Sequence, residues 1–174
     1  FAVVSGREGG LTRLWVITGI SGSGSGSSSG SGSGSGVPTC SGAHAVEMPE
    51  EASTVHTSVN CNFDTDRVRL SYSSMVTPTS TLEYEVSSRQ LKTLKVKEVP
   101  DYDQQHYMTE RTEITAADGT KVPLSLVFRK DLYPKGFSGR CPAGIDGPAP
   151  CFLYGYGSYG ACMEPSFSFR RLPL

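Results

Sequence analysis

The strongest constraint on the fold is a regular alternation of polar and apolar residues in the middle of the chain. The segment 67–74 alternates in this way, and the segment 81–86 repeats the pattern. Successive side chains of an extended strand point to opposite faces, so this spacing predicts strands with one buried face. A third strand is expected over 91–99, after a polar turn at 87–90. Together the segments predict a meander of antiparallel sheet, as in a sandwich or in one blade of a propeller.

The chain begins with two further strand signals. AVVS and RLWVIT are short apolar runs on either side of Gly9-Gly10, a pair typical of a tight hairpin turn. The sixteen residues 21–36 that follow are all Ser or Gly. Such a segment has nothing to bury, so we expect a disordered insertion in a surface loop, with no chemistry of its own.

The character of the sequence changes after Pro100, which predicts a domain boundary there. TEITA and VPLSLVFR are expected to be the arms of a hairpin, with Asp118-Gly119 as its turn. A loop rich in Pro and Gly then occupies 132–150 and leads to CFLY at 151–154. Because CFLY is apolar throughout, it predicts a short strand buried on both faces. We expect no long amphipathic helix anywhere in the chain.

The charge balance argues against some classes of partner. The chain has 16 Lys and Arg against 17 Asp and Glu, and its formal net charge is −1. Nothing in this balance favours nucleic acid or an anionic membrane surface as a partner. No apolar run approaches the roughly 20 residues that a membrane-spanning helix needs.

The cysteines and histidines indicate neither a metal site nor a cofactor. No two cysteines have C-x-x-C spacing, and His44, His56 and His106 stand apart from one another. We therefore expect free thiols in a reducing compartment, the cytoplasm, and no cofactor. The cysteines are Cys40, Cys61, Cys141, Cys151 and Cys162.

Residues 155–160, called here the Gly–Tyr loop, are the main candidate for a functional site. Their sequence GYGSYG fits the G-x-G-x-x-G pattern of dinucleotide-binding loops, but that pattern needs a helix directly behind it, and Pro165 follows soon. Ser158 does not stand in a nucleophile elbow, because Tyr156 occupies the place where G-x-S-x-G requires glycine. From the residues alone two interpretations stay open: tyrosines that pack, or a tyrosine hydroxyl that stabilises a developing oxyanion.

Three motifs carry a resemblance to a known family. They are YSSMVTPTS, AADGTKVPLSLV, and LYGYGSYG with the PSFS that follows it. From about Asn62 to Leu174 the chain closely resembles the oligopeptidase B branch of the prolyl oligopeptidase family. The resemblance implies a seven-bladed β-propeller inserted before the main part of an α/β-hydrolase domain. Residues 1–99 would be the C-terminal part of the propeller and residues 100–174 the first strands of the hydrolase domain. The expected fold class is thus a β-rich fragment, cut at both ends.

The resemblance also implies an activity. Members of this branch are serine peptidases that cleave short peptides after Arg or Lys through an acyl-enzyme. Tyr156 matches the family tyrosine whose hydroxyl completes the oxyanion hole, and Tyr159 matches an aromatic position at the pocket for the residue before the scissile bond. The family's catalytic Ser, Asp and His match positions beyond Leu174, so this chain alone is expected to be inactive. The alternative is an inactive binding module or pseudo-enzyme built on the propeller, and the oligomeric state stays open.

Overall fold

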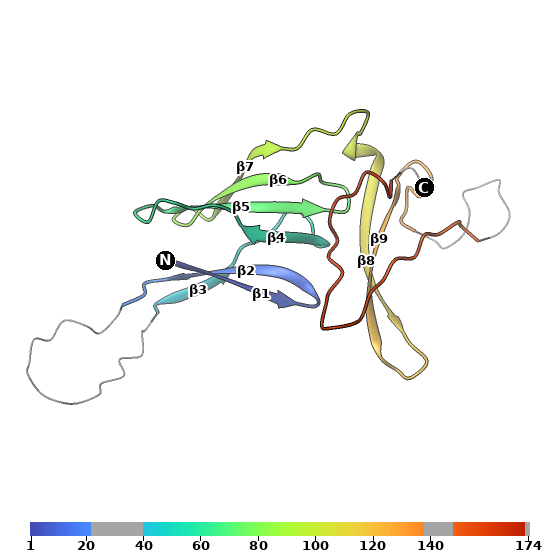
Figure 1. Ribbon diagram of the computed structural model, residues 1–174, viewed down its shortest axis with the longest axis horizontal. Coiled ribbons are helices and arrows are strands. Elements are labelled where there is room, and N and C mark those ends of the chain that lie inside the picture. Colours follow the sequence, from blue (N-terminus) through green and yellow to red (C-terminus); the bar gives the residue numbers. More distant parts are fainter. Residues whose placement is uncertain (22–39, 138–147, 173–174) are drawn as a thin grey trace, which may run out of the picture.

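The computed structural model describes residues 1–21, 40–137 and 148–172, and in this part the chain is built from β-strands (Figure 1). The strands form three antiparallel sheets of three, four and two strands within the described residues. The expected β-rich fold is confirmed. The elements in chain order are β1 (Ala2–Glu8), β2 (Leu11–Thr18), β3 (Gly42–Ala45), β4 (Ser53–Thr57), β5 (Arg67–Ser74), β6 (Ser80–Glu85), β7 (Gln90–Val96), the 3₁₀ turn η1 (Gln104–His106), β8 (Tyr107–Thr115) and β9 (Lys121–Arg129).

The first sheet has the order β1-β2-β3. Glu8 pairs with Leu11, and the two glycines between them have φ of +56° and +79°. Two positive φ angles in a two-residue connection match the right-handed twist of the strands, so the predicted Gly9-Gly10 hairpin is confirmed. Strand β3 was not expected from the sequence, because its four residues carry no large apolar side chain. Except for Ser21, the Ser/Gly segment 21–36 lies outside the described residues.

The second sheet is the predicted meander, with the order β4-β5-β6-β7. The alternating segments form β5 and β6, and the third predicted strand forms β7, although it ends at Val96. Arg89, in the expected polar turn, has a φ of +57°. The sequence did not predict β4, whose apolar side chains are limited to Val55. This strand forms because its backbone pairs along β5 from Ser53 to Thr57.

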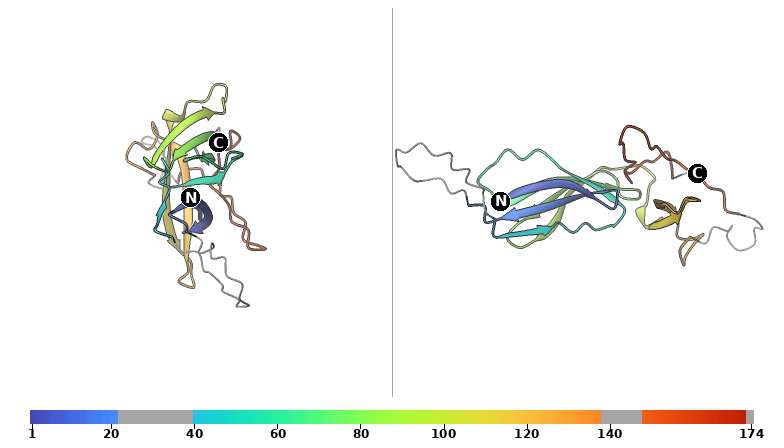
Figure 2. Two further views of the ribbon diagram at one scale, coloured as in Figure 1. Left: turned by 90° about the vertical axis from the view of Figure 1, so that its left-hand side faces the viewer. Right: turned by 90° about the horizontal axis from the view of Figure 1, so that it is seen from below.

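The hydrophobic core lies between these two sheets (Figure 2). Leu14 and Val16 of β2 and Val55 and Leu70 of the second sheet are all fully inaccessible to solvent. Burying a side chain of this size stabilises the fold by about 1.5–3 kcal/mol. The same core cluster is completed by Val46, Val68, Tyr72, Leu82 and Tyr84.

The third sheet is the predicted hairpin of β8 and β9. Its strands are longer than the sequence indicated, pairing from Tyr107 with Arg129 to Thr115 with Lys121. Asp118 and Gly119 form the turn, where Gly119 has a φ of +86°. The side chain of Arg111 in β8 donates to the carbonyl of Gly9, so the hairpin meets the same end of the first sheet where β1 turns into β2.

The expected buried strand at 151–154 is wrong for this structure. Residues 151–157 have no regular secondary structure, and the side chains of Phe152 and Leu153 are 64% and 78% exposed. A strand buried on both faces needs hydrogen-bonded neighbours and covering layers. None of the sheets in the described residues includes this segment. Among the same residues no helix is long and apolar enough to cross a membrane.

Candidate functional site

The Gly–Tyr loop ends in a tight turn. The amide of Ala161 donates to the carbonyl of Ser158 over 3.0 Å. The two residues inside this turn, Tyr159 and Gly160, have φ of +54° and +66°, the signs that a type I′ turn requires. No helix follows the loop among the described residues, so the dinucleotide-binding interpretation, which needs one, does not apply.

The tyrosines of this region all lie at the surface. Tyr156 is 51% exposed and Tyr159 is 97% exposed, and Tyr154 just before the loop is also exposed. At Gly155 and Gly157 an added Cβ would meet no other atom within 4 Å. The loop therefore presents two tyrosine side chains beside an unobstructed backbone, and none of these rings is part of the core.

Behind the loop, residues 163–168, called here the return segment, come back to the two larger sheets (Figure 1). The Glu164 carboxylate accepts a hydrogen bond at Oε1 from the Arg7 guanidinium of β1, at 2.5 Å. Its Oε2 accepts from the Thr54 hydroxyl of β4 at 2.7 Å, and His56 Nε2 lies 3.3 Å from the same oxygen. One carboxylate thus joins both sheets to the segment that follows the loop.

The electrostatics of Glu164 favour its charged form. Burial alone would raise the pKa of this carboxyl, since it removes water from the charge. The hydrogen bonds from Thr54, Arg7 and His56 outweigh burial and hold the pKa below its ordinary value. Glu164 is therefore ionised at neutral pH.

The return segment has a second anchor three residues further on. The amide of Phe167 donates to Ser73 Oγ at the end of β5, over 3.0 Å. The Phe167 ring meets the edge of Tyr102 with 5.0 Å between centroids, and Pro165 between the two anchors is buried. Burial raises the pKa of Tyr102 to about 12, so its hydroxyl remains a donor, and it donates to the carbonyl of Val76.

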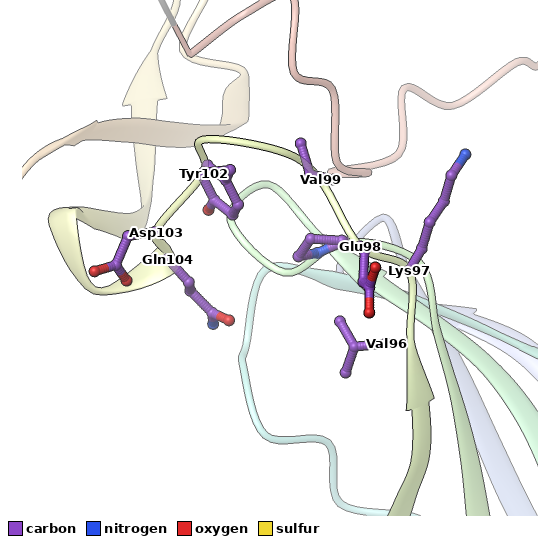
Figure 3. A pocket seen from close by; sticks show the side chains of 8 residues that line it. Val96, Lys97, Glu98, Val99, Tyr102, Asp103 and Gln104 are labelled. Carbon is purple, nitrogen blue, oxygen red and sulfur yellow. The ribbon is translucent and has the colours of Figure 1, made fainter.

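A cavity of about 310 Å³ lies where the second sheet leads into η1 (Figure 3). Gln104 beside it donates through Nε2 to Thr77 Oγ1 over 2.8 Å. None of the lining residues belongs to the Gly–Tyr loop, and the described residues contain no group of three His, Cys, Asp or Glu that could hold a metal. The lining residues are Pro78, Val96, Lys97, Glu98, Val99, Tyr102, Asp103 and Gln104.

The three histidines have separate surroundings, as their spacing predicted. His44 Nε2 lies 2.9 Å from the hydroxyl of Tyr84, and His106 lies 3.9 Å from Asp103. His56 belongs to the group of Arg7, Thr54, His56 and Glu164, called here the Glu164 cluster. The described cysteines, Cys40, Cys61, Cys151 and Cys162, are exposed and free, whereas Cys141 lies outside the described residues.

Sequence reasoning missed the Glu164 cluster. Its members come from β1, β4 and the return segment, which are far apart in the chain, and no local spacing connects them. The available signal was the PSFS motif directly behind Glu164, because it contains the buried Pro165 and the docked Phe167.

Comparison with known proteins decides the family. The model of the prolyl oligopeptidase N-terminal β-propeller domain matches residues 1–97, which include both larger sheets. The chain belongs to the prolyl oligopeptidase family.

Individual members of the prolyl oligopeptidase family match more of the chain. Dipeptidyl aminopeptidase BI of Pseudoxanthomonas mexicana is 41% identical over 130 residues, which are 74% of this chain and 16% of that protein. The structure of oligopeptidase B from Leishmania major matches with a TM-score of 0.70 at 36% identity. Oligopeptidase B from Trypanosoma brucei, in a closed form with covalently bound antipain, matches with a TM-score of 0.68 at 34% identity. Each structural match covers 98% of this chain and 21% of the other, so the expected resemblance to oligopeptidase B is confirmed. The chain spans about a fifth or less of the length of these relatives.

Proposed function

We propose that this chain is part of a serine oligopeptidase that hydrolyses short peptides after Arg or Lys through an acyl-enzyme. The proposal is carried by the likeness to two oligopeptidase B structures over nearly the whole chain. One of those enzymes holds covalently bound antipain, and a covalent adduct requires an enzyme nucleophile. The serine, histidine and aspartate of this chemistry match no residue of the chain, which we expect to be inactive alone.

The proposal divides the chain near residue 100. Residues 1–99 would supply the last part of the propeller, in agreement with the family match over 1–97. Residues 100–174 would begin the α/β-hydrolase domain, and the β8–β9 hairpin supports this because it forms a sheet of its own.

In the proposed reaction the hydroxyl of Tyr156 donates a hydrogen bond to the scissile carbonyl oxygen as negative charge develops there. The open space at Gly155 and Gly157 supports this role, because it allows a peptide to approach the backbone closely. Tyr159 would line the pocket for the residue before the scissile bond. Both side chains are exposed and therefore free to meet a substrate.

We also propose a cytoplasmic location. The four described cysteines are exposed and free, as thiols are in a reducing compartment. Short peptides are the proposed partners. In the first step the serine oxygen attacks the scissile carbonyl, the amine product leaves with a proton from the histidine, and an acyl-enzyme ester remains; in the second step water hydrolyses this ester and regenerates the serine.

The Tyr156→Phe variant tests the proposal in a full-length peptidase that carries this chain. The substitution removes only the hydroxyl, so we expect kcat for an Arg-containing peptide to fall about 10- to 1000-fold, the usual range for one oxyanion donor. KM and the thermal unfolding midpoint should change little. The measurement is steady-state hydrolysis together with thermal unfolding.

Tyr154→Phe is the matched control, because Tyr154 is an exposed tyrosine just before the same loop. We expect its kcat to equal that of the parent enzyme. An unchanged kcat in Tyr156→Phe would remove the oxyanion role. Absence of hydrolysis in the parent enzyme itself would favour the pseudo-enzyme or binding module.

A further inference from the structure

Glu164 lies at the end of a row of hydrogen bonds that crosses from one sheet to the other. The amide of Val55 in β4 donates to Thr12 Oγ1 of β2 over 2.8 Å, and the Thr12 hydroxyl donates to Thr54 Oγ1 over 3.4 Å. Thr54 then donates to Glu164 Oε2. Thr12 and Thr54 are themselves buried. Hydrogen bonds linked in this way polarise and strengthen one another. The bond from Thr54 to the carboxylate therefore depends on the placement of β2 against β4.

Within the described residues, Glu164 is the first anchor behind the Gly–Tyr loop. Every residue from 151 to 163 is exposed, and the first partly buried position behind the loop is Glu164. The loop's turn closes at Ala161, three residues before Glu164. At about 3.4 Å per extended residue, the tether between them is at most about 10 Å long. A shift of Glu164 therefore moves the loop.

We propose that Glu164 is a positioning residue, which holds the Gly–Tyr loop against Arg7 of β1 and Thr54 and His56 of β4 and so couples Tyr156 to the packing of the two propeller blades. The catalytic part of this inference rests on the proposed function. The structural part, fixation of the loop by Glu164, rests on the contacts of Glu164 with Arg7, Thr54 and His56, and amide exchange tests it without catalysis.

The contacts argue for positioning more than for stability. Arg7 and Glu164 are both accessible to solvent, with side-chain exposures of 41% and 25%. Ion pairs of this kind contribute little to folding, since water screens them and ordering two side chains costs entropy. A misplacement of about 1 Å in a catalytic group, in contrast, can lower a rate as much as 100-fold. The loss of the Glu164 charge should therefore lower kcat and the order of the loop more than it lowers the free energy of unfolding.

The experiment is a double-mutant cycle in a full-length peptidase that carries this chain, with the variants Glu164→Gln, Tyr156→Phe and both together. Glu164→Gln keeps the size of the side chain and removes its charge. We expect it to lower kcat about 3- to 30-fold, part of the contribution of one oxyanion donor, with the unfolding midpoint unchanged. In the Tyr156→Phe background the same substitution should change kcat less than 2-fold, because the group that it positions is gone. Arg7→Gln should reproduce the single-variant effect.

Glu85→Gln is the matched control. It breaks the ion pair between Arg67 and Glu85, which has a distance of 3.0 Å and belongs to β5 and β6 rather than to the return segment. This variant should keep the parent kcat. If it lowers kcat as much as Glu164→Gln does, the effect is general electrostatics and the inference is wrong.

Hydrogen exchange of the Ala161 amide measures the loop without any catalysis. This amide is bonded inside the turn, and we expect about 10-fold faster exchange in Glu164→Gln as the turn loosens. Unchanged exchange would overturn the inference whatever the kinetics show. Faster exchange with full activity in Tyr156→Phe would uphold loop fixation and reject the proposed oxyanion role. Faster exchange with a Glu164→Gln effect that persists in Tyr156→Phe would show that Glu164 does not act through Tyr156, and the coupling would be rejected.

Discussion

Tyr159 adopts a backbone conformation that bulky residues rarely take. Its φ is +54°, and its side chain is 97% exposed, so no packing explains the strain. Strained residues of this kind concentrate where a side chain must be held for a task, at a cost of the order of 1–3 kcal/mol. The exposed aromatic ring in this strained turn supports the proposed role of Tyr159 at the pocket for the residue before the scissile bond.

The Tyr159→Gly variant separates the turn from the ring. Glycine adopts positive φ without steric cost, so we expect the fold to be unchanged or slightly more stable. Loss of the ring should raise KM for an Arg-containing peptide about 10-fold, with a smaller change in kcat, as expected for a binding contact. Kinetics of the full-length enzyme and thermal unfolding measure the two effects. An unchanged KM would assign Tyr159 to the turn alone.

At the scale of elements, a threonine joins the two blades. Thr12 Oγ1 accepts a hydrogen bond from the amide of Val55, and this amide lies in the buried N-terminal part of β4. Backbone donors that lose such a partner inside a core are costly because water cannot replace it. The seam between the blades therefore combines apolar packing with a specific polar contact.

The Thr12→Val variant removes this acceptor and keeps the shape of the side chain. We expect the free energy of unfolding of the blade pair to fall by about 1–3 kcal/mol. Urea denaturation of residues 1–174, followed by the fluorescence of Trp15, the one tryptophan in this segment, measures the loss. Thr93→Val, at an exposed residue of β7, is the control and should change stability by less than about 0.5 kcal/mol. Equal stability of the two variants would show that the hydrogen bond from Val55 to Thr12 does not stabilise the contact between the sheets.

At the scale of the whole molecule, the return segment closes the chain onto both blades. Arg7 comes from near the start of the sequence and Glu164 from near its end, and Figure 1 shows their segments meeting at one end of the sheets. The hairpin contact between Arg111 and Gly9 lies at the same end. This end is thus where the propeller part and the later part of the chain are held together.

Acid should weaken the contacts of Glu164 with Arg7 and Thr54 that hold the return segment to both sheets. The pKa of Glu164 is lower in the folded chain than its ordinary value of 4.5, so its stabilising effect is fully present above 4.5 and is lost as the pH falls through the folded pKa. Arg7, Thr54 and His56 are the groups that face the carboxylate. Exchange of the Phe167 amide, corrected for its intrinsic pH dependence, should speed up at acid pH. In Glu164→Gln this acid-dependent gain should vanish, and its persistence would point to another carboxyl.

The sequence by itself determined the strands that local spacing encodes. Alternation over Val68, Leu70 and Tyr72 defined a buried face, and glycines at Gly10 and Gly119 defined turns, because both signals act over a few residues. The family motifs also lay in the sequence itself. These features required no knowledge of what lies nearby in space.

Only the tertiary structure decided which weak strand signals form strands and which distant residues meet. Strands β3 and β4 form because a neighbouring strand offers backbone partners, although their own side chains give little signal. CFLY has a strand-forming sequence and forms none, since no described strand pairs with it. The cluster of Arg7, Thr54 and Glu164 brings together residues more than 100 positions apart. Hydrogen-bond partners and burial are properties of the assembled fold, and the spacing of residues along a chain does not contain them.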